Sequence, residues 1–256
     1  TFSADRHVVI LAGAEQRAWD LNPAWKLERT FGTGGPDSPL VDRVNALAFR
    51  RDGRRLAAGG GEPSRSSELR IWDPTTGADL YSITNLHSDA VLSVAFSPDG
   101  AWLASGGADR FARVIDAGTC KPVRAFEGHT GHVLGVAWAP SGRTLASGGA
   151  DGVVKFWNFT TGERKKQGGG FGKEVGSLVY VANDQLVAMT GDPAVRVLNE
   201  NADKVRDLEG TKDFQVSGAA SVDGTTIVSG GLDGVLRVWR GSETKPFREF
   251  RSEERR

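Results

Sequence analysis

The 256-residue sequence has few of the residues that carry most protein chemistry: one cysteine, one methionine and four histidines. The single Cys120 excludes an internal disulfide framework and any Cys-x-x-Cys metal or haem motif. Excess charge of either sign is absent too, because 32 basic residues balance 32 acidic ones. A balanced chain lacks the electrostatic basis for nucleic acid as its main partner. No run of about 18 apolar residues occurs, so we expect no membrane insertion.

The sequence does contain one segment that is repeated, with changes, along the chain. Its best copy, residues 128–158, reads GHTGHVLGVAWAPSGRTLASGGADGVVKFWN. Three short apolar stretches, at residues 133–138, 144–147 and 153–157, are separated in it by turn residues. Asp-Gly between two apolar stretches, here Asp151-Gly152, is a strong signal for a β-hairpin. We therefore expect three consecutive antiparallel strands in each copy, and a fourth before the next copy.

The copies recur at a nearly constant interval. The second predicted strand returns as LAAGG, LASGG, LASGG and IVSGG, beginning at Leu56, Leu103, Leu145 and Ile227. The third predicted strand ends at Trp72, Ile115, Trp157, Leu198 and Trp239, so successive copies are 43, 42, 41 and 41 residues apart. One four-stranded sheet cannot bury both of its faces alone, so we expect neighbouring sheets to stack and cover each other.

A period just above forty residues with four short strands and a Gly-His…Trp-Asp-like frame resembles the WD-repeat family of β-propellers. The resemblance implies an all-β fold in a single domain over residues 1–256. It further implies five complete four-stranded antiparallel blades and one partial blade, as part of a seven-bladed ring. The expected blades cover residues 2–31 (partial), 41–86, 87–126, 128–165, 170–208 and 210–250. The near-uniform repeats are similar to bacterial WD-repeat arrays, so we expect this chain to be a segment of a larger protein.

The resemblance also implies a structural line of hydrogen bonds inside each well-kept repeat. The line runs from a His before the first strand, through a Ser or Thr in the second and an Asp in the hairpin, to a Trp in the third. Its expected members are His129, Ser147, Asp151 and Trp157 in one repeat, His87, Ser105 and Asp109 in the repeat before it, and Ser229, Asp233 and Trp239 in the last repeat. Buried carboxylates need such donors, so we interpret the line as a device that stiffens the blade.

A His-Ser-Asp set is also the composition of a catalytic triad. Here the set recurs at the repeat period, which a single active site would not do, so we predict no catalytic residues and no enzyme activity. His129 and His132 lie three residues apart on a predicted loop with no third ligand near them in the sequence. We therefore predict neither a metal site nor a cofactor.

Members of the resembling family generally present the loops at one rim to other proteins or peptides. The sequence therefore predicts a non-catalytic interaction platform with a protein or peptide partner. The expected rim residues are Arg43, Asp89, His132, Lys173 and Asp213, each just before a first strand, together with Arg110 and with Arg65 in an inserted loop at residues 61–67. Two alternatives stay open. One is a structural or assembly module of a multidomain enzyme or haem protein, with its other domains upstream, and the other is a propeller enzyme with an axial active site.

Overall fold

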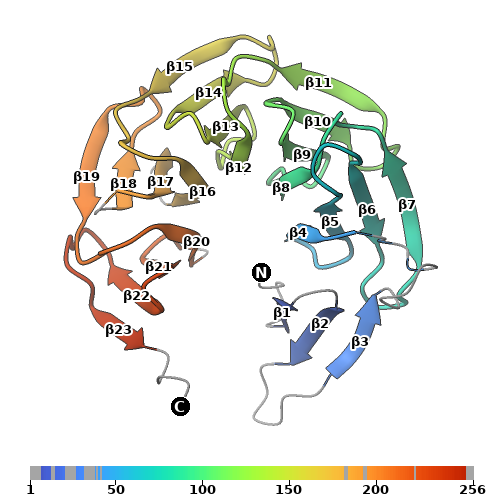
Figure 1. Ribbon diagram of the computed structural model, residues 1–256, viewed down its shortest axis with the longest axis horizontal. Coiled ribbons are helices and arrows are strands. Elements are labelled where there is room, and N and C mark those ends of the chain that lie inside the picture. The colour runs from blue at the N-terminus through green and yellow to red at the C-terminus, as the bar shows by residue number, and fades with distance from the viewer. Residues whose placement is uncertain are drawn as a thin grey trace. The chain divides into compact units, whose positions relative to one another are not determined.

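The computed structural model describes residues 7–12, 15–20, 27–31, 38, 40, 42–181, 184–192, 195–221 and 223–251. Over this part of the chain the regular structure consists of antiparallel β-strands arranged in six sheets (Figure 1). The chain divides into two compact units, Thr1–Glu127 and Gly128–Arg256. Within the described ranges we find no helix with the length and apolar character needed to cross a membrane.

The first unit contains one three-stranded sheet and two four-stranded sheets. The three-stranded sheet consists of β1 (His7–Ala12), β2 (Glu15–Asp20) and β3 (Leu27–Phe31). The next consists of β4 (Val44–Phe49), β5 (Leu56–Gly60), β6 (Glu68–Trp72) and β7 (Asp79–Thr84). The last consists of β8 (Val91–Phe96), β9 (Trp102–Gly107), β10 (Ala112–Asp116) and β11 (Pro122–Phe126).

The second unit contains three four-stranded sheets. The first is formed by β12 (Val133–Trp138), β13 (Thr144–Gly149), β14 (Val154–Asn158) and β15 (Arg164–Gly168). The second is formed by β16 (Val175–Val181), β17 (Gln185–Thr190), β18 (Val195–Leu198) and β19 (Lys204–Leu208). The third is formed by β20 (Gln215–Ala220), β21 (Thr226–Gly231), β22 (Val235–Arg240) and β23 (Arg248–Arg251).

In every sheet each strand pairs with the strand that follows it in the chain, so all connections are hairpins. This topology follows from the local turn signals, because a short polar loop can only join antiparallel neighbours. The hairpin between β13 and β14 has Gly152 at φ +67°, a conformation that glycine adopts without steric cost. The expected five four-stranded sheets plus a partial sheet are confirmed. Residues 2–6, 13–14 and 21–26 of the predicted partial blade lie outside the described residues.

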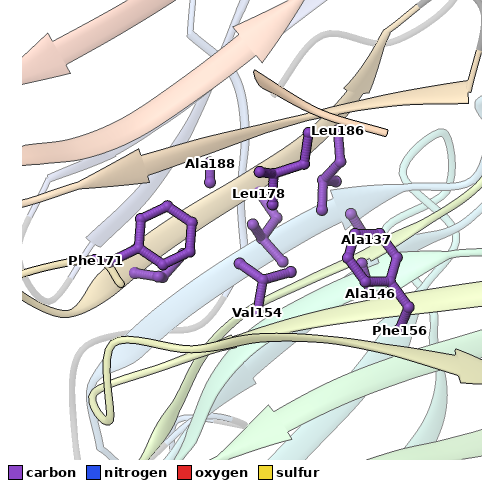
Figure 2. Close-up of a cluster of buried hydrophobic side chains, with 10 residues drawn as sticks. Ala137, Ala146, Val154, Phe156, Phe171, Leu178, Leu186 and Ala188 are labelled. Carbon is purple, nitrogen blue, oxygen red and sulfur yellow. The ribbon is translucent and has the colours of Figure 1, made fainter. Parts of the chain in front are cut away.

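The hydrophobic core of each unit lies between successive sheets, where each sheet covers a face of its neighbour. Figure 2 shows the best-packed example, in which Ala146 and Phe156 of the β12–β15 sheet meet Leu178 and Leu186 of the β16–β19 sheet. A second cluster joins the β16–β19 and β20–β23 sheets, and a third joins the β4–β7 and β8–β11 sheets of the first unit. Stacking is therefore the source of burial, as the repeat pattern predicts.

Two consecutive glycines at the end of β13 leave space for the next sheet and for a pair of polar side chains. A Cβ added at Gly148 would lie 2.6 Å from Cγ1 of Val175, so the missing side chain lets the next sheet approach. A Cβ at Gly149 would lie 2.5 Å from Oδ1 of Asp151 and 2.6 Å from Nδ1 of His129. The second glycine thus leaves room for a polar pair at the sheet end.

Candidate interaction site

The polar pair beside Gly149 belongs to a continuous line of hydrogen bonds that joins four side chains. His129 Nδ1 lies 3.0 Å from both carboxylate oxygens of Asp151, and its Nε2 lies 2.8 Å from Oγ of Ser147. The indole Nε1 of Trp157 donates to the same Oγ at 2.8 Å. Because that oxygen accepts from the indole, its own hydroxyl hydrogen is left to donate to Nε2, and Nδ1–H then donates to the carboxylate.

A shorter version of this line of hydrogen bonds lies in the β8–β11 sheet. His87 Nδ1 is 2.8 Å from Asp109 Oδ1, and His87 Nε2 is 2.8 Å from Ser105 Oγ. Ile115 occupies the place of the tryptophan and is fully buried, so no indole donor reaches the serine. The guanidinium of Arg113 adds a bond instead, with Nη1 donating to Asp109 Oδ2 at 2.5 Å.

Burial and hydrogen bonding fix the charges of these groups. Burial lowers the pKa of His87 and of His129, and the facing carboxylates only partly oppose this effect, so both rings are neutral at pH 7. Burial by itself would raise the pKa of Asp151, but hydrogen bonds from the Thr130 amide and from His129 outweigh it and lower the pKa. The result is a buried carboxylate that stays ionised because donors surround it.

The Asp-His-Ser order of these bonds matches a catalytic triad in connectivity, but the serine is inaccessible. Ser147 is 0% exposed and Ser105 is 1% exposed. The lone pairs of Ser147 Oγ are also engaged by the indole of Trp157. A catalytic serine must reach the substrate as well as transfer its proton to the base. Neither of these buried serines can reach a substrate. The arrangement also occurs in two sheets, which fits a structural role.

The last sheet does not form the expected line through Ser229, Asp233 and Trp239. No histidine precedes β20, and Ser229 Oγ donates to Oε1 of Gln215 at 2.6 Å instead. The indole of Trp239 donates its hydrogen bond to the backbone carbonyl of Glu209 at 3.2 Å instead of to the serine. With the histidine missing, the buried hydroxyl and indole each satisfy their hydrogen bonds with the nearest available group.

One set of site residues was missed by the sequence analysis: a basic residue on the third strand, two positions before the residue in the tryptophan position. The set comprises Arg70, Arg113, Lys155, Arg196 and Arg237. Three of its members lie four residues after the hairpin aspartate of their own sheet and pair with it: Arg113 with Asp109, Arg196 with Asp192, and Arg237 with Asp233. The recurrence of Arg or Lys in RIW, RVI, KFW, RVL and RVW was the signal that could have found them.

In four of the sheets the hairpin aspartate also holds the loop that enters the sheet, an arrangement we call the aspartate clamp. Asp109 accepts from the amide of Ser88 at 3.1 Å, and Asp151 accepts from the amide of Thr130 at 2.9 Å. In the β16–β19 sheet Asp192 accepts from the amide of Gly172 at 3.0 Å. Hydrogen bonding from the backbone of Lys212 likewise helps to lower the pKa of Asp233, after the larger effect of the Arg237 side chain. Each clamp thus anchors one residue of an entering loop.

Four of the seven expected rim residues lie one or two positions after these anchored amides. Asp89, Lys173 and Asp213 each follow an anchored residue directly, and His132 follows one by two positions. The side chains of all seven expected rim residues except Asp89 are exposed, and Asp89 is half-buried. In the first unit Oδ1 of Asp89 accepts from the amide of Ser64 at 2.7 Å. This bond ties the inserted loop, which carries Arg65, to the loop that enters β8.

Within the described residues no group of three or more His, Cys, Asp or Glu side chains is arranged to hold a metal ion. Cys120, which is partly buried, has its thiol pKa raised to about 11 by burial. The thiol is therefore protonated at neutral pH, and only the thiolate form of a cysteine is a strong nucleophile or metal ligand.

Comparison with known proteins identifies the class to which these sheets belong. The family model of the WD40 repeat, described as WD domain, G-beta repeat, matches residues 27–73, 79–116, 120–158 and 202–240. The matched segments make up more than half of the chain, and the chain therefore belongs to the WD40 repeat family. Proteins of this family generally act as protein-interaction scaffolds.

Particular relatives and structures agree with this assignment. Nuclear distribution protein PAC1 from Coccidioides posadasii is 46% identical over 66 residues, which cover 26% of this chain and 14% of that protein. The APC/C activator protein CDC20 from Saccharomyces cerevisiae is 31% identical over 239 residues, or 87% of this chain and 37% of that protein. The crystal structure of the RRP9 WD40 repeats superposes with a TM-score of 0.75 at 24% identity, covering 82% of this chain and 64% of that one. The fold is therefore that of a WD40 β-propeller.

The chain spans only part of each of these relatives. It covers between 14% and 23% of the nuclear distribution proteins that it matches.

Proposed function

We propose that this chain is a non-catalytic platform that binds a protein or peptide through the loops entering its sheets. The observation that carries the proposal is the aspartate clamp, because it anchors loop residues one or two positions before three of the rim residues, Asp89, His132 and Lys173. A binding surface gains affinity when its contact groups are already held in place before the partner arrives. The aspartate of each clamp holds the loop in place, and the rim side chains close to the anchored amide make the contacts with the partner.

The rim side chains favour a polar and charge-selective contact. Arg43, Arg65 and Arg110 in the first unit are basic and exposed. In the second unit the exposed Lys173 and Asp213 have opposite charges. Charged groups of this kind contribute mainly to the association rate and to the choice of partner. An enzyme with an axial site has less support, because the Asp-His-Ser sets are buried and recur in two sheets.

The test measures binding of a purified partner by two rim variants, one for each unit. The partner is first obtained by cross-linking on the immobilised chain, and its dissociation constant is then measured by calorimetry. The rim variants are R43Q/R65Q/R110Q in the first unit and H132Q/K173Q/D213N in the second. The matched controls remove exposed charges on or directly beside the outer strands, K121Q/R124Q in the first unit and K166Q/R248Q in the second.

We expect at least one rim variant to weaken binding by about tenfold or more, a loss of about 1.4 kcal/mol. Its thermal unfolding midpoint should stay within about 2 °C of the wild type, because exposed substitutions cost little stability. The outer-strand controls should bind as the wild type does. Equal binding by the rim variants and their controls would remove the rim assignment and favour a structural or assembly module.

A further inference from the structure

A cavity of about 380 Å3 lies in the first unit, where the inserted loop, the segment joining β7 to β8, and β10 meet. Its lining includes two guanidinium groups, those of Arg65 and Arg113, and the side chains of Ser66, Asn85 and Ser88. Cavities of this size are common for small ligands and for single side chains of a bound peptide. The density of hydrogen-bond donors in its wall points to an anionic occupant.

Arg113 differs from the two equivalent arginines of the second unit in what it faces on the fourth strand. In the second unit these arginines face an acid directly across the β18–β19 and β22–β23 pairs. The pairs are Arg196 with Asp207, at 3.3 Å, and Arg237 with Glu249, at 3.2 Å. Arg113 is paired in register with Ala125, which offers no acceptor. The carboxylate that lies opposite the arginine in those two repeats is therefore missing from this one.

The guanidinium of Arg113 is held in a defined orientation. Its Nη1 donates to Asp109 Oδ2 at 2.5 Å and lies 2.6 Å from Nδ1 of His87, and its plane packs over the ring of Phe111 at 4.5 Å from the centroid. Its Nε and Nη2 have no hydrogen-bond partner among the residues that the structure describes. The side chain is 21% exposed, which leaves these nitrogens accessible from the cavity.

The acidic groups around the cavity leave two nitrogens of this guanidinium unused. Asp109 accepts bonds from His87, from the amides of Ser88 and Phe111, and from Nη1 of Arg113, so it engages one of the three guanidinium nitrogens. Across the cavity Arg65 is 73% exposed and pairs with Glu62, which is 45% exposed. An exposed pair of this kind is worth at most about 1 kcal/mol, so the guanidinium can exchange it for a ligand.

We propose that this cavity binds one anionic group, a carboxylate or a phosphoryl group, on the free nitrogens of Arg113 with Arg65 as the second cation. A guanidinium binds both kinds of anion through paired N–H···O bonds. The hydroxyl of Ser88 and the amide of Asn85, for which the described part of the chain shows no partner, supply further donors. We assign the anion to an acidic or phosphorylated side chain of the bound peptide, and in that assignment the inference rests on the proposed function. A free inorganic anion is the other source of the same chemistry.

The first arm of the test uses inorganic phosphate and the full chain labelled with 15N-arginine. The Nε–Hε signals of Arg113 and Arg65 are followed by NMR during the titration, with sodium chloride at equal ionic strength as the reference. We expect saturable shifts of both signals with phosphate and none with chloride. R65Q should weaken phosphate binding by about fivefold, a loss of about 1 kcal/mol.

The second arm supplies the missing acid from within the chain. Ala125 is exposed, so A125E can place a carboxylate opposite Arg113, as Glu249 lies opposite Arg237. This variant should lose phosphate affinity by about tenfold or more, because the internal carboxylate competes for the same nitrogens. The isosteric A125Q should bind phosphate within about twofold of the wild type. Circular dichroism of both variants checks that the sheets are intact.

The third arm distinguishes the two sources of the anion. Heptapeptides Gly-Ser-Gly-X-Gly-Ser-Gly carry glutamate, phosphoserine or alanine at X and compete with phosphate at the Arg113 signal. Competition by the acidic peptides alone supports the peptide source, whereas binding of phosphate alone supports the site and overturns the peptide assignment. Absence of saturable shifts in the wild type, or equal shifts in A125E and wild type, overturns the proposal. The phosphate arm needs no partner, so its result is independent of the rim-variant test.

Discussion

Replacement of Asp151 by alanine tests whether the aspartate clamp stabilises the second unit. The carboxylate is 9% exposed and accepts bonds from His129 and from the amide of Thr130. The alanine variant removes the acceptor of both donors while leaving the sheet pairing of β13 and β14 in place.

The expected loss follows from what each donor can do next. Thr130 is exposed, so its amide can bind water and loses only the net value of a hydrogen bond to a charged group, about 1.5 kcal/mol. The side chain of His129 is 0% exposed, so its Nδ1–H becomes an unpaired buried donor at a cost of about 1–3 kcal/mol. Asp151→Ala should therefore destabilise the protein by about 3 kcal/mol. For a domain of this size that lowers the thermal midpoint by about 6–12 °C.

The assay is urea unfolding followed by tryptophan fluorescence, together with hydrogen exchange of the segment 128–133. Asp151→Asn keeps one acceptor oxygen and should fall between alanine and wild type. Glu163→Ala, an exposed carboxylate in the same unit, is the matched control and should stay within about 0.5 kcal/mol. If Asp151→Ala costs no more than Glu163→Ala, the clamp does not stabilise the fold and the reasoning fails. Unchanged exchange at Thr130 would separately show that the loop is held by other contacts.

Three further predictions concern pH, close packing and a buried ion pair. Burial lowers the pKa of His129 in the folded state below its unfolded-state value of about 6.5. Below pH 6.5 the unfolded chain therefore binds more protons than the folded chain, and the free energy of unfolding should fall as the pH is lowered toward 5. In urea unfolding, each such histidine should contribute a loss of up to about 1.4 kcal/mol per pH unit. Gly148→Ala should cost about 1–3 kcal/mol by overpacking, whereas Gly169→Ala, with nothing within 4 Å, should be neutral in the same unfolding assay. Arg237→Gln should cost about 3 kcal/mol because Arg237 is 1% exposed and pairs with two acids, whereas Arg251→Gln, at a side chain 70% exposed, should shift the thermal midpoint by less than about 2 °C.

Much of the fold was accessible from the sequence because its determinants are local and repeated. The alternation of apolar residues, the Asp-Gly hairpins and the 41- to 43-residue interval predict four-stranded sheets wherever the copies are well kept. The structure brings together His129, Ser147, Asp151 and Trp157, whose positions in the repeat the family resemblance had suggested. Arrangements of this kind can be predicted from the sequence repeat because all of the interacting residues lie within one repeat.

The site could be predicted only in part because the hydrogen-bond partner of a buried side chain depends on strand register and on which nearby donors and acceptors are still unpaired. Ser229 and Trp239 occupy the expected positions in the last repeat, yet Gln215 and the Glu209 carbonyl take the bonds that a histidine and a serine take elsewhere. The choice follows from distances between strands and loops, which no residue type reveals by itself.

The sequence by itself determined the class of fold and the sheet topology, because these depend on patterns within one repeat, and the family resemblance suggested where the Asp-His-Ser sets lie. Only the tertiary structure decided that hairpin aspartates such as Asp109 hold a loop amide close to a rim residue, and that Arg113 faces Ala125 rather than an acid. The physical reason is that both features join groups from different strands and loops. Their meeting is set by strand register and by the packing of the chain around them, and neither can be read from the order of residues.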